Sequence, residues 1–437
     1  MTFDNNIITE KTSFIKKFLF LILVLFMGKG CNFFIDLDPR VNIVGTLLVL
    51  VPMLYVMLTE KPHSMKNSKF YVFLLAYIAW LVYHIFTDEA YPTYQGIRIL
   101  SLFILGFITV RYYGYHIAEY FEYFVVRLTI LALILWSVEV AIGPATMGGF
   151  APFENRMHIY CKSFGLFSVV TRFDPSEYFL GLPRNSGFCW EAGQFASMIV
   201  LALTFHLLRT KEKFYKNKSF WILLAGLITT FSTTGFVTFG VLLFFKTVFG
   251  KVSVGKRIAY IAVLGTLYMF AMNLPFMREK MEAQSDITEF YTNSDNVWID
   301  ETGQRTVQRF EGMYLSWMNF MDSPWLGFGP NRDNSLVSKQ FPMFIISNGN
   351  INPLAMLGLL LGLPLFVLFY RGSCRLNQYL GDDKKYIIFM IFIFFSVSYN
   401  YLFDIIPLAI AFLSFYNQYI TSYDRVPILF NSHSMLE

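Results

Sequence analysis

The stretch Gly181-Leu-Pro-Arg-Asn-Ser-Gly-Phe-Cys-Trp-Glu-Ala-Gly-Gln-Phe-Ala196 is the part of the sequence around which the remainder can be organised. It combines an arginine, a carboxylate and several glycines, and it leads directly into an apolar segment that begins near Phe195. Charged, turn-rich backbone beside a membrane helix costs free energy unless protein or water satisfies its polar groups. Arg184 and Glu191 are therefore the first residues to consider for function.

The composition of the whole chain is that of a membrane protein. Of its 437 residues, 55% are hydrophobic and only 15% are charged, whereas soluble domains carry roughly 25% charged residues. The 49 Phe and 26 Tyr are spread along the sequence, which indicates many membrane spans and not one anchor. The first apolar run lacks a cleavage site of small residues, so we interpret it as a span and not as a signal peptide.

Apolar runs of about 20 residues predict the spans. The pair on either side of Ser232-Thr-Thr-Gly235 has two interpretations: two short helices that meet at a polar break, or one long kinked helix. With two helices there, the sequence predicts about twelve spans, near 14–34, 41–58, 70–86, 97–112, 124–142, 193–208, 219–232, 234–249, 258–274, 350–370, 386–401 and 402–420.

The distribution of lysine and arginine predicts the orientation of these spans, because basic residues concentrate in cytoplasmic loops. The loops near Lys61, Arg209, Lys256 and Arg371 are basic, and the short loops on the opposite side carry few cations. Twelve spans with both termini in the cytoplasm satisfy this rule, so the fold class that we predict is an all-α polytopic membrane protein, with residues 1–437 as one membrane domain. The net charge of +5 then follows from topology and implies no nucleic acid.

Two segments are too polar to span, residues 143–192 and 275–349, and this topology places both outside. Loops of this length are usually functional or disordered, and their many aromatic residues disfavour disorder. Only short basic loops remain on the cytoplasmic side, and no GxxxxGK[ST] pattern occurs, so nothing indicates ATP binding.

The second polar segment contains a predicted amphipathic helix over 302–321. Its apolar residues recur at intervals of three and four, and Pro324 ends the pattern. Arg305 and Arg309 are four apart, so on a helix they share one face. The helix is expected either to lie along the membrane and address an anionic group, or to expose a solvated cationic face beside lipid phosphates. The apolar stripe consists of Val307, Phe310, Tyr314, Trp317 and Met321.

Other charged and thiol groups leave alternatives open. Arg184 and Glu191 form either a structural ion pair or a reactive pair in which Glu191 is a general base. Cys161 and Cys189 fall in the same polar segment and can pair, although sequence alone does not show that they do. Cysteine and histidine do not cluster, so no metal site is predicted. Arg98, Glu139 and Asp404 lie near the predicted outer ends of spans, a depth at which charged groups tend to line cavities.

Three segments, in this order, resemble the superfamily of O-antigen polymerases and ligases, the Wzy and WaaL types. The first is Arg184-Asn-Ser-Gly-Phe-Cys-Trp-Glu191, followed by Gly193 and Phe195-Ala196. The second is Phe231-Ser-Thr-Thr-Gly235, between two short spans. The third runs from Arg309 through Pro324-Trp-Leu-Gly-Phe-Gly329 to Ser347-Asn-Gly-Asn-Ile-Asn-Pro-Leu-Ala-Met-Leu-Gly358. The resemblance covers residues 184–365 and includes the topology with two large exterior loops.

One departure from the pattern favours a polymerase. Ser347 stands where ligases of this superfamily carry a histidine important for activity, so the resemblance provides no catalytic histidine. It implies a Wzy-type enzyme of the bacterial inner membrane that moves a glycan from undecaprenyl pyrophosphate to the end of a second lipid-linked repeat unit. Neither nucleotide nor metal cofactor is required, because the lipid pyrophosphate is already an activated leaving group.

The same resemblance suggests roles for individual residues. Arg184, Arg305 and Arg309 are expected to bind pyrophosphate, since the planar guanidinium group addresses phosphate oxygens bidentately. Glu191 and Arg309 are the expected catalytic residues, with Glu191 activating the acceptor hydroxyl. Ser347 and Asn348 are candidate substrate contacts.

Expected partners are the undecaprenyl-pyrophosphate-linked oligosaccharide, membrane lipids and, as a further candidate, a chain-length regulator. Two alternatives remain. A ligase would transfer the finished glycan to lipid A core, and a lipid-linked oligosaccharide flippase would be a transporter and not an enzyme. Transporters often show internal repeats and buried polar groups near the membrane midplane, and this sequence shows neither pattern.

Overall fold

The structure is a computed structural model of the full chain. It describes residues 14–29, 39–59, 67–88, 93–151, 153–154, 161–170, 178–179, 181–210, 216–248, 305–307, 309–342, 344–346, 349–381 and 385–416, together with the single residues 255, 258, 262 and 265. The predicted span 258–274 therefore lies almost entirely outside the described residues.

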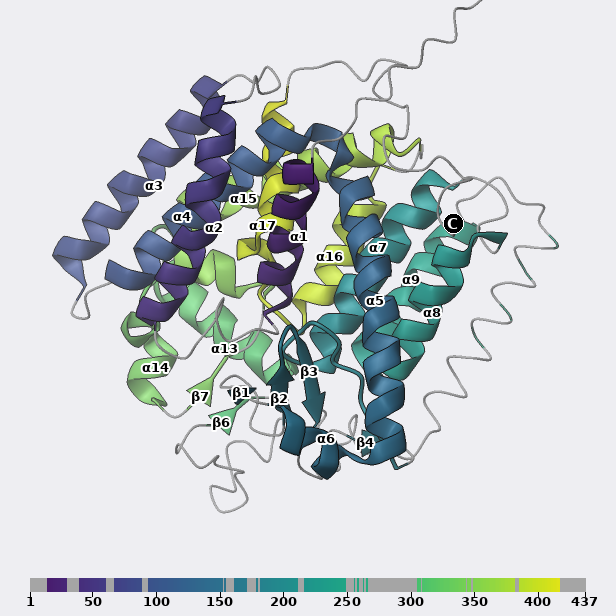
Figure 1. Ribbon diagram of the computed structural model, residues 1–437. Coiled ribbons are helices and arrows are strands. Elements are labelled where there is room, and N and C mark those ends of the chain that lie inside the picture. The colour runs from purple at the N-terminus through teal and green to yellow at the C-terminus, as the bar shows by residue number, and fades with distance from the viewer. Residues whose placement is uncertain are drawn as a thin grey trace, which may run out of the picture.

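The described part of the chain is predominantly helical (Figure 1). Three short 3-10 turns (η1, η6 and η7) join or end helices, and a fourth, η5, lies in the second polar segment. The helices are α1 (Phe14–Gly28), α2 (Pro39–Thr59), α3 (Asn67–Thr87), α4 (Thr93–Tyr113), α5 (Ile117–Ile142), α6 (Pro144–Phe150), α7 (Ala192–Arg209), α8 (Lys218–Thr229), α9 (Thr233–Val248), α13 (Arg309–Asp322), α14 (Leu336–Gln340), α15 (Asn352–Tyr379), α16 (Ile387–Ser396) and α17 (Ile405–Phe412). The 3-10 turns are η1 (Gly114–His116), η5 (Arg332–Asn334), η6 (Tyr401–Phe403) and η7 (Leu413–Phe415).

Four of the described helical stretches are long and apolar enough to cross a membrane: Ser68–Thr87, Tyr94–Ile142, Ala192–Arg209 and Asn352–Tyr379. The second of these is continuous over 49 residues because η1 joins α4 to α5. Several shorter apolar helices accompany them, among them α8, α9 and α16. These helices confirm an all-α fold of membrane-protein character. The chain also breaks between α8 and α9, as the two-helix interpretation of that region expects.

Helix α7 lies in the interior of the helical bundle (Figure 1). Every residue from Ala192 to Leu208 is buried, and α7 packs against α5, α8 and α9. A helix that is apolar on all sides is expected in such a position. Its hydroxyl groups are satisfied within the helix: Ser197 Oγ donates to Gly193 O at 3.0 Å, and Thr204 Oγ1 donates to Val200 O at 2.7 Å. Because α7 is buried on every side, its first residues are held in place by the surrounding helices.

The end of α7 is anchored by a buried ionic contact to α5. Glu122 accepts two hydrogen bonds from Arg209, at 2.9 and 3.0 Å, and its Oε1 lies 2.7 Å from His206 Nδ1. Glu122 and His206 are fully buried. A buried carboxylate needs such partners, so this contact fixes α7 along its axis.

Short strands and helices from both long polar segments gather at one end of the bundle (Figure 1). The first segment supplies α6, an antiparallel sheet of order β1-β2-β3 and the pair β4-β5; the second supplies α13, α14 and the parallel pair β6-β7. The strands are β1 (Phe153–Glu154), β2 (Cys161–Phe164), β3 (Phe167–Val170), β4 (Tyr178–Phe179), β5 (Leu182–Pro183), β6 (Arg305–Thr306) and β7 (Phe344–Ile345).

The predicted amphipathic helix 302–321 is wrong at its start. Arg305 and Thr306 pair with Phe344 and Ile345 as parallel strands, and α13 begins at Arg309. The pairing uses backbone groups that a helix would need, so Arg305 and Arg309 do not share a helix face. Of the predicted apolar stripe, Tyr314, Trp317 and Met321 on α13 are exposed, at 48%, 49% and 58% accessible, whereas Val307 lies before the helix and is buried.

Candidate functional site

The stretch that leads into α7 is bound to the break between α8 and α9. Arg184 Nε donates to Thr230 O at 3.2 Å. Asn185 donates through its backbone N to Thr229 O and through Nδ2 to Thr229 Oγ1, both at 3.0 Å, while its Oδ1 accepts from Gly187 N. Buried amides of this kind need their full set of partners. The entrance to α7 is therefore bonded to the end of α8, and the first two segments approach closely farther along, since a Cβ atom added to Gly235 would lie 2.7 Å from Ala196 Cβ.

The α8–α9 break in turn contacts the break between α16 and α17. Thr234 Oγ1 lies 3.1 Å from Ser398 Oγ. Phe231 has a positive φ of 45°, a strained conformation for a residue with a side chain, and it forms a ring contact with Phe179. Irregular backbone inside a membrane protein is stable only where protein or water satisfies it. The contact between the two helix breaks satisfies part of the polar groups of this irregular region within the protein.

The α16–α17 break also contacts the chain that enters α15 and the start of α7. Gly349 N donates to Ser396 O at 2.7 Å. A Cβ atom added to Gly193 would overlap with Tyr399 Oη and lie 3.4 Å from Glu191 Oε1. Glu191, Gly193 and Tyr399 are thus close together, and the glycine is required for this approach. The ring of Trp190 also packs edge-on against Tyr399.

A cluster of charges lies beside Glu191. Lys29, directly after α1, forms an ion pair with Asp404 at 3.2 Å, directly before α17. Lys29 also forms a backbone bridge with Cys189, and Trp190 N donates to Gly28 O at 3.1 Å. Cations and carboxylates that converge in a partly buried position can bind an anionic group and accept a proton.

Three of the groups that face Cys189 can be named from their effect on its thiol. Burial raises the pKa of Cys189 well above its usual value, the negative charges of Glu191 and Asp404 raise it further, and the positive charge of Lys29 opposes them. Cys189 is fully buried and is a free thiol, so it does not form the disulfide with Cys161 that the sequence left open. The β-hairpin backbone and the core hold this segment without a disulfide.

The third segment of the resemblance is folded back on itself. Pro324 O and Trp325 O accept hydrogen bonds from Leu359 N and Leu360 N at 2.8 and 3.1 Å, directly after Gly358. Gly358 has φ 64° and interrupts α15, so the carbonyl groups of the turn replace those of the helix. Phe328 N and Gly329 N donate to the carbonyl groups of Ala355 and Met356 in the same helix. The turn 324–329 is therefore fixed to α15.

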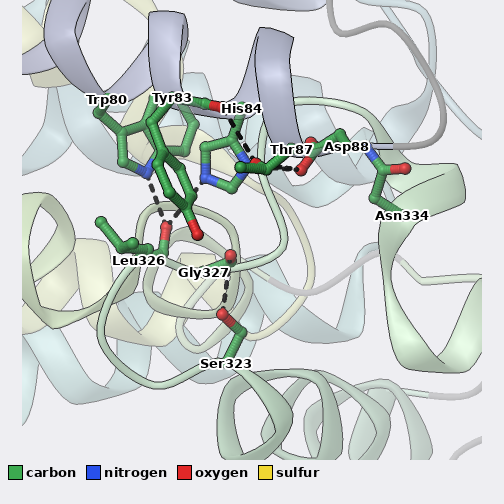
Figure 2. Close-up of polar contacts among 9 residues, drawn as sticks. All are labelled: Trp80, Tyr83, His84, Thr87, Asp88, Ser323, Leu326, Gly327 and Asn334. Carbon is green, nitrogen blue, oxygen red and sulfur yellow. Dashed lines mark hydrogen bonds and ion pairs between the residues drawn. The ribbon is translucent and has the colours of Figure 1, made fainter.

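A pocket of about 480 Å³ lies between this turn and the end of α3 (Figure 2). His84 Nδ1–H donates to Asp88 Oδ1 at 2.9 Å, and Asp88 Oδ2 accepts from Asn334 Nδ2 at 2.7 Å. Trp80 Nε1 donates to Leu326 O at 2.6 Å, and His84 Nε2 lies 3.4 Å from the same oxygen (Figure 2). These bonds hold the turn against α3, and Tyr83, Asp322, Trp325 and Lys339 are among the other residues that line the pocket.

His84 was absent from the residues that the sequence suggested. It falls within an apolar run, where a lone histidine gives no functional signal. The four-residue spacing between His84 and Asp88 at the end of the run is the signal that would have identified the pair.

The predicted site residues are distributed as follows. Glu191 and Arg184 are half-buried at the convergence of helix breaks. Arg98 lies near enough to Asp404 to interact with it electrostatically, whereas the charge of Glu139 acts on Tyr178. Arg305 and Arg309 belong to β6 and α13, but their side chains, like all of Ser347 and Asn348, lie outside the described residues.

In the part of the chain that the structure describes, no group of three or more His, Cys, Asp or Glu residues is arranged to hold a metal ion. In comparisons with known proteins, no family model and no curated protein matches the sequence.

Proposed function

We propose that this chain is a Wzy-type polysaccharide polymerase, a multi-pass glycosyltransferase of the bacterial inner membrane. Its substrates would be undecaprenyl-pyrophosphate-linked oligosaccharides at the outer leaflet. The observation that carries the proposal is the close approach of the first two segments of the resemblance. Arg184 and Asn185 bond to Thr230 and Thr229, directly before Phe231, and a Cβ atom added to Gly235 would lie 2.7 Å from Ala196 Cβ. An active site is commonly assembled from segments that are distant in the sequence and meet at one end of a helical bundle.

The topology proposed with this function has twelve spans, both termini in the cytoplasm and two large periplasmic loops. The contacts between helix ends support it. The helix ends predicted to face the periplasm contact one another: Lys29 contacts Asp404, and Thr234 contacts Ser398. Among the ends predicted to be cytoplasmic, Arg209 contacts Glu122.

In the proposed reaction, a hydroxyl oxygen of the acceptor sugar attacks the anomeric carbon of the donor glycan. The glycosidic bond forms as the bond from that carbon to the pyrophosphate oxygen breaks, and the lipid pyrophosphate leaves with the electron pair. Glu191 would accept the hydroxyl proton. Arg184, Arg305 and Arg309 would bind the pyrophosphate and stabilise the charge that it gains.

The pocket at the turn 324–329 suits a saccharide. Tyr83 and Trp325 line it and are 45% and 65% accessible, and Asp322 and Lys339 supply polar groups. Sugar rings bind proteins through an apolar face on an aromatic ring and hydroxyl groups on charged side chains. We assign this pocket to the glycan, and not to the lipid.

The surface-glycan ladder of a deletion strain tests the proposal. A polymerase deletion leaves lipid A core capped with a single repeat unit, because flipping and ligation continue. Loss of every repeat unit would contradict the proposal and indicate a ligase or a flippase, and accumulated long lipid-linked chains would then identify the ligase. Arg309→Ala should also end chain elongation while the protein still accumulates in the membrane.

A further inference from the structure

A second pocket, of about 420 Å³, lies between the start of α3, the end of α15 and η7. Among the described residues, its lining contains three cations, Lys69, Arg371 and Arg375, and no carboxylate. Like charges held close together repel one another unless an anion compensates them. The remaining lining residues are Leu368, Tyr370, Cys374, Ser414 and Phe415.

The three cations differ in how they are held. Arg375 is a structural residue, since its Nη1 donates to Leu413 O at 2.9 Å and to Tyr416 O at 2.6 Å, where α17 and η7 end. Lys69 and Arg371 are exposed, and within the described residues neither forms an ion pair. Ser414 Oγ likewise has no hydrogen-bond partner in that part of the chain. The pocket therefore presents two cations and a hydroxyl to a ligand.

Exposed apolar side chains extend from the pocket along both helices. On α3, Val72 follows Lys69 by three residues and is 67% accessible. On α15, Val367 and Leu363 precede Arg371 by four and eight residues and are 39% and 50% accessible. Positions three or four apart share a helix face. A cationic pocket at the end of the bundle, with an apolar face beside it toward the middle of the bundle, matches the shape of a lipid. The charged headgroup would occupy the pocket and the acyl chains would lie along the apolar face.

The pocket lies at the opposite end of the bundle from the candidate site. Lys69 is near the start of α3 and His84 is near its end, a separation of about 22 Å along the helix axis. In the topology proposed above, this end faces the cytoplasmic leaflet, where anionic lipids are concentrated.

We propose that this pocket binds the phosphate headgroup of an anionic phospholipid, with Lys69 and Arg371 as its ligands. Zwitterionic lipids carry a compensating ammonium group, for which the described part of the lining offers no carboxylate. Free phosphate shares the same chemistry but lacks acyl chains to occupy the apolar face. The inference does not depend on the glycosyltransferase activity.

The test uses the full chain purified in a neutral detergent and native mass spectrometry with added phosphatidylglycerol or phosphatidylcholine. The wild type should retain phosphatidylglycerol preferentially. Lys69→Gln and Arg371→Gln should each weaken that retention roughly fivefold, the effect of one basic residue near an anionic headgroup. Lys218→Gln is the matched control, because Lys218 is an exposed cation at the start of α8, outside the pocket. Neither pocket variant removes a residue with a described structural bond, so both should fold.

Equal retention of the two lipids by the wild type would overturn the inference. Unchanged retention in both pocket variants, or the same loss in Lys218→Gln, would also overturn it. Inorganic phosphate that displaces phosphatidylglycerol at similar concentrations would show that the pocket binds phosphate alone and not a lipid. The surface-glycan ladder is a separate readout, so failure here leaves the proposed function to its own test.

Discussion

Lys29 Nζ and Asp404 Oδ1 form an ion pair of 3.2 Å that joins the end of the first described helix to the start of the last. The side chain of Asp404 is only 8% accessible and that of Lys29 is 20% accessible. The pair lies beside Cys189 and the stretch that leads to Glu191. It therefore closes the helical bundle at the same end as the candidate site.

Asp404→Asn should lower the stability of the protein by about 2–3 kcal/mol, because it leaves Lys29 without its charge partner in a mostly buried position. The measurement is the midpoint of thermal unfolding in detergent. Lys29→Met combined with Asp404→Asn should recover part of this loss, since the lysine charge that Asp404→Asn leaves without its partner is then removed. Losses that simply add in the double variant would show that the pair contributes nothing as a pair.

A second close relationship joins Gly358 to Trp325. Gly358 has φ 64°, and a Cβ atom there would lie within the backbone carbonyl group of Trp325. Gly358→Ala should therefore cost at least about 2 kcal/mol and release the turn 324–329 from α15. The unfolding midpoint should fall accordingly.

The matched control is Gly240→Ala in α9, where an added Cβ meets no atom within 4 Å. Alanine is the better helix former, so this variant should be neutral or slightly more stable. A Gly358→Ala protein as stable as Gly240→Ala would contradict the tight packing of the turn on α15.

Local sequence patterns identified most helices but not how they meet. Apolar runs placed α3, α4, α7 and α15, because hydrophobicity is a property of the residues themselves. The polar Ser232-Thr-Thr-Gly235 indicated the break between α8 and α9. The start of α13 was wrong because strand pairing with residues 344–345, which are distant in sequence, overrides the local helical period.

The candidate site was only partly predictable for the same reason. Arg184 and Glu191 were identified from glycines and charges in one short stretch. The Lys29–Asp404 pair and the contact of His84 with the turn at Leu326 join residues from opposite parts of the chain. No spacing in the sequence encodes such contacts, so they required the structure.

The thiol of Cys189 should react slowly with alkylating reagents. The thiolate is the reactive form, and a raised pKa reduces its fraction at any pH below that pKa. In a variant that retains only Cys189, labelling of the folded protein should be slow at pH 8 and should accelerate about tenfold per pH unit. A variant that retains only Cys374, which is half-buried, is the control. Rapid labelling of Cys189 at pH 8 would contradict its burial.

Asn185→Ala should weaken the link between the α7 entrance and the α8–α9 break. It removes the donor to Thr229 Oγ1 and the acceptor for Gly187 N, both in a buried region, at a cost of about 1–3 kcal/mol. Asn185→Asp retains the acceptor and loses the donor, and because it also buries a carboxylate it should be at least as destabilising as the loss of the donor alone. Thermal unfolding in detergent measures both variants, and equal stabilities of Asn185→Ala and the wild type would contradict the contact.

The environment of Glu191 gives a prediction about activity that depends on Gly193. Gly193→Ala places a methyl group where Tyr399 Oη lies, so the tyrosine must move away from Glu191. If Glu191 takes the proton from the hydroxyl group of the acceptor sugar, this displacement should shorten the surface glycan. Glu191→Gln should shorten it as well, because that variant removes the base altogether. Adding Tyr399→Phe to Gly193→Ala removes the overlapping oxygen and should restore chain length, but it cannot restore Glu191→Gln. Glycan ladders from cells with equal protein levels provide the measurement. A wild-type ladder from Glu191→Gln would exclude Glu191 as the base. If Tyr399→Phe fails to rescue Gly193→Ala, the close approach of Tyr399 is not the reason why position 193 requires glycine.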